Sequence, residues 1–321
     1  MNKKHMNAQL CRVFDKFVNS IEDEEVRDLV NRGSIITGGA LVSLLTGEEP
    51  HDWDLYFKGF NTCYKVAEYF VNKWNNSRKD KIAAKLRIHK DLSDDSLINS
   101  WITMDEALAE YHRGYEPRIK VFIRSNGVAG DLNEEEDYDT TDNEMQTNVD
   151  PETNIEKTLE ETPVFEPKFL TSNAISLTGK MQLVIRFYGN PSKLHENYDF
   201  VHCTNYWTSW ERQVVLKQEA LESIINKELK YVGSKYPLCS IIRTRKFIGR
   251  GWTINAGQYL KMAMQLNKLD LTSIGVLEDQ LVGVDSLYFQ MLISALQKKK
   301  EENPEFEIND MYITTIIDKL F

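Results

Sequence analysis

Apolar side chains in the N-terminal part of the chain recur with the spacing of one helix face. This spacing predicts a single helix over residues 6–32, which ends at Arg32-Gly33. A short apolar run at 34–37 then predicts a strand. Residues 40–46 predict a short helix that ends before Gly47 and Pro50. The apolar positions of the first helix are Leu10, Val13, Phe14, Phe17, Val18, Ile21 and Val26.

Later segments mix both periodicities. Polar and apolar residues alternate at 52–57, which is typical of a strand, and helical spacing returns at 61–75. The runs 119–123 and 181–187 predict two further strands, and 229–232 looks extended. The remaining predicted helices cover residues 208–226, 237–249, 254–267, 284–300 and 309–320.

These elements predict an α+β fold with a domain change near residue 205. The first predicted domain, 1–205, carries the mixed sheet, and the second, 206–321, is mostly helical. Residues 126–165 are polar, poor in aromatic residues and rich in acidic ones, so they predict a disordered insertion within the first domain. Two interpretations stand for this insertion: a solvated loop without a role, or an acidic arm that nucleic acid displaces from a basic groove.

The net charge of −10 comes from this insertion. Residues 131–163 hold 13 acidic residues and one lysine, a local charge of −12, which leaves +2 for the rest of the chain. The acidic total therefore does not exclude a nucleic-acid partner. The four cysteines form no CxxC pair, and no apolar run is long enough for a membrane span. We expect a reduced protein of the cytoplasm, without a secretory signal.

Asp52 and Asp54 are the first candidates for chemistry. Residues two apart on a strand point to the same face, so the two carboxylates project together and Trp53 points away. Carboxylate pairs suit Mg²⁺, and two such ions can clamp the attacking and leaving oxygens of a displacement at phosphorus. Gly38-Gly39, between a strand and a helix, allow close backbone approach to phosphate.

Residues 38–54, which begin Gly38-Gly39-Ala40-Leu41 and end Asp52-Trp53-Asp54, resemble the DNA polymerase beta-like nucleotidyltransferase superfamily. The resemblance is to the branch of tRNA CCA-adding enzymes and bacterial poly(A) polymerases, with its GGAVRD, LLxG and DxD elements. It implies a mixed-sheet palm, a nucleoside triphosphate at Gly38 and Gly39, and two Mg²⁺ ions at Asp52 and Asp54.

The superfamily also has a third carboxylate on a later strand. Neither 119–123 nor 181–187 contains one, so Asp199, in the apolar run 198–203, is the nominated third metal ligand and catalytic residue. The alternative is an ordinary carboxylate at a strand start. Neighbouring His202 and Cys203 are expected to be core or surface residues, because adjacent strand residues face opposite ways.

A second resemblance lies at residues 250–256, which end in the TINA of the branch's RRDFTINA element. Arg243, Lys246 and Arg250 recur along one face of the preceding predicted helix and are candidates for binding nucleotide phosphates or RNA. The alternative is a solvated helix face. Two departures count against CCA addition: Val42-Ser43 replace Arg-Asp, and no EDxxR element for base selection is present.

The chain also resembles nucleotidyltransferase-like proteins of large bacteriophages, in residues 173–177, 198–203 and 243–257. Together these features predict a Mg²⁺-dependent transfer of a nucleoside monophosphate from NTP to an acceptor hydroxyl, with an RNA 3′ end as the first acceptor. The alternatives are transfer to a protein or small molecule, and a non-catalytic binding or structural protein that keeps the fold.

Overall fold

The computed structural model describes residues 2–77, 83–90, 101–122, 165–171 and 173–271, with five isolated positions further on. The expected insertion at 126–165 lies outside these residues except for Phe165. The helices expected at 284–300 and 309–320 also lie outside them, apart from positions 311 and 314. In the described part, no helix combines the length and the apolar character needed to cross a membrane.

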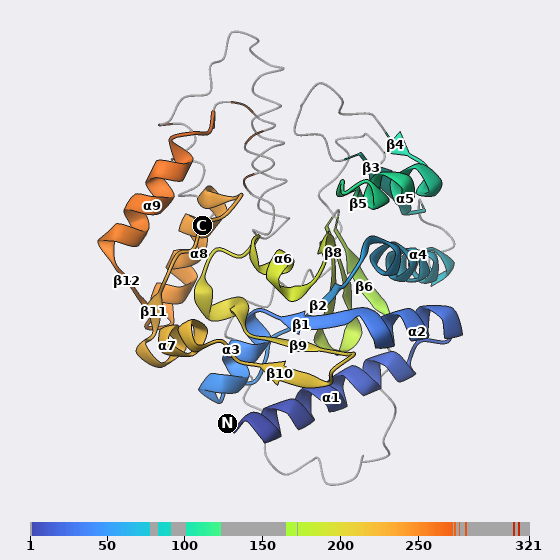
Figure 1. The fold of residues 1–321 in the computed structure, drawn as a ribbon, viewed down its shortest axis with the longest axis horizontal. Coiled ribbons are helices and arrows are strands. Elements are labelled where there is room, and N and C mark those ends of the chain that lie inside the picture. Colours follow the sequence, from blue (N-terminus) through green and yellow to red (C-terminus); the bar gives the residue numbers. More distant parts are fainter. Residues whose placement is uncertain are drawn as a thin grey trace, which may run out of the picture.

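A seven-stranded sheet forms the centre of the molecule, in the order β10-β9-β1-β2-β8-β7-β6 (Figure 1). β2 and β8 run parallel, and the other neighbouring strands run antiparallel. The expected α+β fold with a mixed sheet is therefore confirmed. The strands are β1 (Ser34–Thr37), β2 (Trp53–Phe57), β6 (Pro167–Leu170), β7 (Ala174–Leu177), β8 (Met181–Tyr188), β9 (Tyr206–Thr208) and β10 (Gln213–Val215).

The prediction of one N-terminal helix over 6–32 is wrong, because the segment forms α1 (Lys3–Asn19) and α2 (Glu24–Gly33). Asp23 causes α2 to begin where it does. Its side chain accepts a hydrogen bond of 3.0 Å from the backbone N–H of Val26, which caps the first turn. Apolar spacing continues across this break, so periodicity alone did not reveal it.

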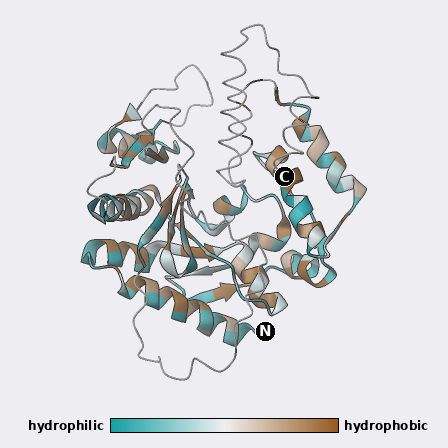
Figure 2. Cartoon of the chain, turned by 180° about the vertical axis from the view of Figure 1, so that it is seen from behind, coloured by the Kyte–Doolittle hydropathy of each residue, from teal (hydrophilic) through white to brown (hydrophobic). Residues whose placement is uncertain are grey.

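One face of the main sheet is covered by α1, α2 and α4 (Phe60–Ser77), the last of which matches the helix expected at 61–75. Hydrophobic and hydrophilic residues alternate along α1, as they do in a helix that packs one side on a core (Figure 2). Phe14, Phe17 and Phe70 of these helices are buried with Trp207 of β9.

A second sheet lies beside α4, at the opposite end of the molecule from α9 (Figure 1). It has three strands in the order β4-β3-β5: β3 (Lys85–His89), β4 (Trp101–Ile102) and β5 (Arg118–Phe122). β5 matches the strand expected at 119–123. α5 (Met104–His112) follows β4 and begins with a capping box formed by Thr103 and Glu106.

Leu194, after β8, is buried with Ile35 and Tyr56 on the opposite face of the main sheet. The remaining elements are short or belong to the C-terminal part of the chain. These elements are α3 (Gly39–Thr46), η2 (Thr178–Lys180), α6 (Pro191–His195), η3 (Val201–Thr204), α7 (Gln218–Asn226), β11 (Glu228–Leu229), α8 (Pro237–Gly249), β12 (Thr253–Ile254) and α9 (Ala256–Leu266). α8 and α9 match the helices expected at 237–249 and 254–267.

The helix expected at 208–226 is wrong in its first half. Residues 206–215 form β9 and β10, which pair with each other and with β1. Val214 and Val215 of β10 are buried or partly buried in the main sheet, which explains why their apolar side chains mimic a helix face. The main sheet therefore continues past residue 205, and the domain division at that position stays a prediction.

Candidate active site

Gly38 joins β1 to α3 in a conformation that favours glycine, with φ of 97° and ψ of −147°. A Cβ atom at this position would lie 3.2 Å from Asp54 Oδ2 and 3.6 Å from Tyr198 Oη. The Gly38 backbone N–H donates to the carbonyl oxygen of Cys203 at 3.2 Å. The Gly-Gly turn and the second Asp of the DxD motif therefore approach each other so closely that a side chain at position 38 would press on the carboxylate.

Gly39, the first residue of α3, borders open space, because a Cβ there would meet no atom within 4 Å among the described residues. No side chain caps the N-terminus of α3. Its first backbone N–H groups therefore keep their capacity to bind an anion. α3 packs on two sides. Leu41 and Leu44 belong to the main core, and Val42 packs against a second core that includes Phe200, Trp252 and Met262. Val42 thus has a packing role where the resembling branch has arginine.

Asp54 lies in β2, and Asp52 precedes the first residue of that strand. Asp52 is exposed, and Asp54 is half-buried. Burial and then the negative charge of Asp52 raise the pKa of Asp54 to about 8, against the opposing effect of Arg243. An acidic group in this state favours a bound cation, since a cation would relieve the repulsion between the two carboxylates.

β8 lies parallel to β2, and Gln182 pairs with Asp54. Side chains alternate along β8, so Gln182, Val184 and Arg186 share the face of Asp54. The strand beside the DxD motif therefore places the amide of Gln182, and no carboxylate, next to Asp54. The nominated third carboxylate, Asp199, comes from another part of the chain. It lies between α6 and η3, in a segment that is not the strand expected from its apolar pattern.

Asp199 is buried, and its Oδ2 accepts a hydrogen bond from Arg243 Nη1 at 2.8 Å, in an ion pair that anchors α8. Arg243 also acts on the pKa of Asp54, so this cation serves both carboxylates. Among the residues that the structure describes, no three His, Cys, Asp or Glu side chains are grouped to hold a metal ion. The fitting donor set is the pair Asp52 and Asp54, whose carboxylate oxygens suit Mg²⁺.

The other two cations of the predicted stripe, Lys246 and Arg250, are exposed on α8 and at its end. Only Arg243 is brought to the carboxylates. His202 is fully buried, with its ring 4.8 Å from that of Phe247 and 4.5 Å from that of Trp252, as expected for a core residue. Burial lowers the pKa of His202 to about 4.

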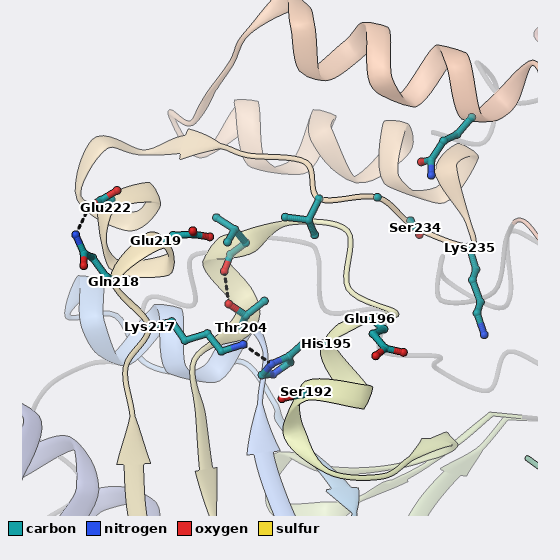
Figure 3. Close-up of a pocket in the computed structure, with 14 residues that line it drawn as sticks. Ser192, His195, Glu196, Thr204, Lys217, Gln218, Glu219, Glu222, Ser234 and Lys235 are labelled. Carbon is teal, nitrogen blue, oxygen red and sulfur yellow. Dashed lines mark hydrogen bonds between the residues drawn. The ribbon is translucent and has the colours of Figure 1, made fainter. Parts of the chain in front are cut away.

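A chain of polar contacts at Thr37, the residue before Gly38, was not predicted from the sequence. Lys217 Nζ lies 3.0 Å from His195 Nδ1, and His195 Nε2 lies 3.0 Å from Thr37 Oγ1 (Figure 3). An ammonium group only donates, so Nδ1 accepts, Nε2 carries the proton, and the Thr37 hydroxyl donates to the Asn205 carbonyl at 2.8 Å. Burial and then Lys217 lower the pKa of His195 to about 3. This chain fixes the end of β1.

His195 and Lys217 also line an open cavity of about 1060 Å³ between α6, α7 and residues 232–235 (Figure 3). Its rim carries both signs of charge, with Glu196 and Glu219 near Lys235 and Lys217. Neither Gly38 nor Asp54 lines this cavity. The carboxylate pair is therefore not part of the lining of this cavity, and the contact between His195 and Thr37 links the lining to the end of β1.

Fold and site together define an α+β protein with a mixed sheet and a Gly-Gly turn close to a DxD carboxylate. Residues 9–227 match the sequence model described as Gabija anti-defense 2 family protein. The chain belongs to this family. A search of curated proteins finds no match.

Among solved structures, the chain is similar to the Thermotoga maritima CCA-adding enzyme complexed with tRNA. The identity is 12%, the TM-score is 0.39, and the match covers 97% of this chain and 58% of that one. A CCA-adding enzyme in complex with CTP matches with 12% identity and a TM-score of 0.37, over 94% of this chain and 54% of that one. The chain spans a little over half the length of these proteins.

Proposed function

We propose that this protein is a Mg²⁺-dependent nucleotidyltransferase of the DNA polymerase beta-like superfamily. It would transfer a nucleoside monophosphate from NTP to an acceptor hydroxyl. The observation that carries the proposal is the close approach of the Gly38 backbone to Asp54, where an added Cβ would lie 3.2 Å from Oδ2, beside the uncapped N-terminus of α3. One small region thereby combines an anion-binding helix end with a carboxylate pair.

Asp52 and Asp54 would hold Mg²⁺. When bound, the metal supplies charge neutralisation at the phosphates and lowers the pKa of the attacking hydroxyl. The N–H groups at Gly39 and the start of α3 would orient the triphosphate, with the open space beside Gly39 leaving room for it. The acceptor oxygen forms a bond to the α-phosphorus, the bond to the bridging oxygen breaks, and pyrophosphate leaves.

In this proposal, Arg243 neutralises negative charge at the carboxylates and phosphates, and Lys246 and Arg250 bind phosphates further along α8. Asp199 was nominated as a metal ligand. Ligation would require it to leave its 2.8 Å bond to Arg243. We therefore assign Asp199 the role of positioning Arg243, with metal ligation as the alternative.

The acceptor in our proposal is an RNA 3′ end, which follows from the resemblance to the branch that extends RNA. The family description supports a second acceptor. An anti-defense protein acts against a host defence, and transfer of a nucleotide to a protein of that defence would inactivate it. We propose in either case that the activity serves a bacteriophage in its host.

The test is incubation of the full-length protein with each labelled NTP, Mg²⁺, total RNA and host lysate. We expect label on RNA with the wild type and none with the double variant Asp52→Asn, Asp54→Asn. The matched control is Asp28→Asn, which changes an exposed aspartate on α2 and keeps full activity. Label on a protein would support the second acceptor. No label on either, with no shift in melting temperature on adding NTP and Mg²⁺, would exclude catalysis.

A further inference from the structure

The three-stranded sheet has one buried face and one outward face. Ile88, Ile119 and Val121 are buried in the main core, so residues that alternate with them on β3 and β5 point to the other side. The register places Arg87 opposite Lys120, and His89 opposite both Arg118 and Trp101. We define the small-sheet face by its residues Arg87, His89, Trp101, Arg118, Lys120 and Phe122.

Aromatic rings form the centre of the small-sheet face. The ring of Trp101 lies 4.7 Å from that of Phe122, edge to face, and 3.7 Å from that of His89. Phe122 is 40% exposed, which is unusual for a side chain so large and apolar. The Arg87 guanidinium lies 5.3 Å from the centre of the Trp101 ring. The Trp101 ring is therefore covered by its neighbours and supports Phe122, whose exposed ring offers a flat surface for a planar partner to stack on.

Positive charge surrounds these rings. Three of the six residues are Arg or Lys, and none is acidic. Burial, followed by the charges of Lys120, Arg118 and Arg186, lowers the pKa of His89 to about 4. Arg87 and Lys120 are directly opposite each other in register, so two basic residues of neighbouring strands lie on this face.

The small-sheet face is connected to the candidate active site through β8. Arg186 of β8 acts on His89, and it shares a strand face with Gln182, the partner of Asp54. Arg186 lies four positions after Gln182, which corresponds to roughly 13 Å of strand. Arg186 Nη2 also donates to Tyr236 Oη at 2.8 Å, just before α8 begins. Arg186 therefore extends the positive charge of the small sheet onto the strand that pairs with Asp54.

We propose that the small-sheet face binds a single-stranded polynucleotide. Its bases stack on the exposed ring of Phe122, which Trp101 supports, and its phosphates contact Arg87, Arg118 and Lys120. In a duplex the faces of the bases are stacked inside the helix, and an acidic peptide would contact the cations but would not need the rings. The combination of rings and cations therefore favours a single-stranded polynucleotide. That this strand is the acceptor rests on the proposed function, whereas the binding itself does not.

The test measures binding of short labelled oligouridylate and oligothymidylate to the full-length protein, without NTP or Mg²⁺. We expect single-strand binding that weakens steeply as salt increases. The double variant Arg87→Ala, Phe122→Ala should bind about tenfold more weakly or worse. The control is Lys168→Ala, Phe169→Ala, which removes a similarly exposed cation and ring from the edge strand β6 and should bind like the wild type.

Tighter binding of oligouridylate than of oligothymidylate would identify the bound strand as RNA. Equal loss in both double variants, no binding by the wild type, or equal binding of a duplex or a polyglutamate peptide would each overturn the proposal. The variant Asp52→Asn, Asp54→Asn should bind the single strand normally. If the wild type binds the single strand but transfers no label, the proposed catalysis is rejected and the proposed binding by the small-sheet face still holds.

Discussion

Gly38 and Gly39 are adjacent, yet their surroundings differ. At Gly38 the backbone has a positive φ, and an added Cβ would press on Asp54. At Gly39 an added Cβ would project into open space. The first glycine is therefore needed for the fold of the turn, and the second leaves room for a ligand.

Replacement of each glycine by alanine separates these roles. We expect Gly38→Ala to destabilise the protein by about 1–3 kcal/mol, because its conformation is strained for other residues. Gly39→Ala should keep the wild-type melting temperature but lose most of the stabilisation that NTP and Mg²⁺ provide. Thermal unfolding with and without NTP measures both effects. A Gly39→Ala variant that binds NTP like the wild type would place the triphosphate elsewhere.

His195 predicts how stability depends on pH. Its pKa is lowered to about 3 in the folded protein by burial and by Lys217, against about 6.5 in the unfolded chain. Between these values the unfolded state binds a proton that the folded state does not, so stability is complete above pH 6.5 and is lost as pH falls. The expected loss at pH 5 is about 1–2 kcal/mol.

His195→Gln removes this contribution while keeping an amide that can donate to Thr37. We expect the variant to lose less stability than the wild type between pH 7 and pH 5, as measured by urea unfolding. A variant whose loss on acidification equals that of the wild type would show that His195 takes up a proton freely in the folded state.

At the scale of elements, local patterns predicted strand–turn–helix–strand correctly across residues 34–57. They did so because the stop signals there are strong: two glycines, then Gly47 and Pro50. The patterns failed at residues 6–32 and 208–226. In the first, apolar spacing ran through the capping break at Asp23, and in the second, buried strand residues imitated a helix face.

The break at Asp23 can be tested as a cap. Asp23→Ala removes the acceptor for the Val26 N–H and should lower the free energy of unfolding by about 1 kcal/mol. Asp28→Ala is the matched control on the same helix. Asp28 forms an exposed ion pair with Arg32, so we expect its replacement to lower the free energy of unfolding by about 0.3 kcal/mol. Chemical denaturation checks both, and equal effects would mean that Asp23 does not cap α2.

At the scale of the molecule, residues distant in sequence meet at the site. β8, more than 120 residues after β2, supplies Gln182 beside Asp54, and α8 supplies Arg243 to Asp199. The strand β8 could be predicted from the sequence, but its pairing with β2 could not. The same holds for the small-sheet face, whose strands β3 and β4 were not predicted, and for the contact from Lys217 through His195 to Thr37.

The sequence by itself determined the Gly-Gly turn, the carboxylate pair and the mixed α and β character of the chain. Each of these depends on residues within about one element of each other, where propensity and spacing act directly. Only the tertiary structure decided that Asp199 pairs with Arg243, that an amide neighbours Asp54, and that rings and cations share one face of the small sheet. These features depend on strand order and long-range packing, which local periodicity does not specify.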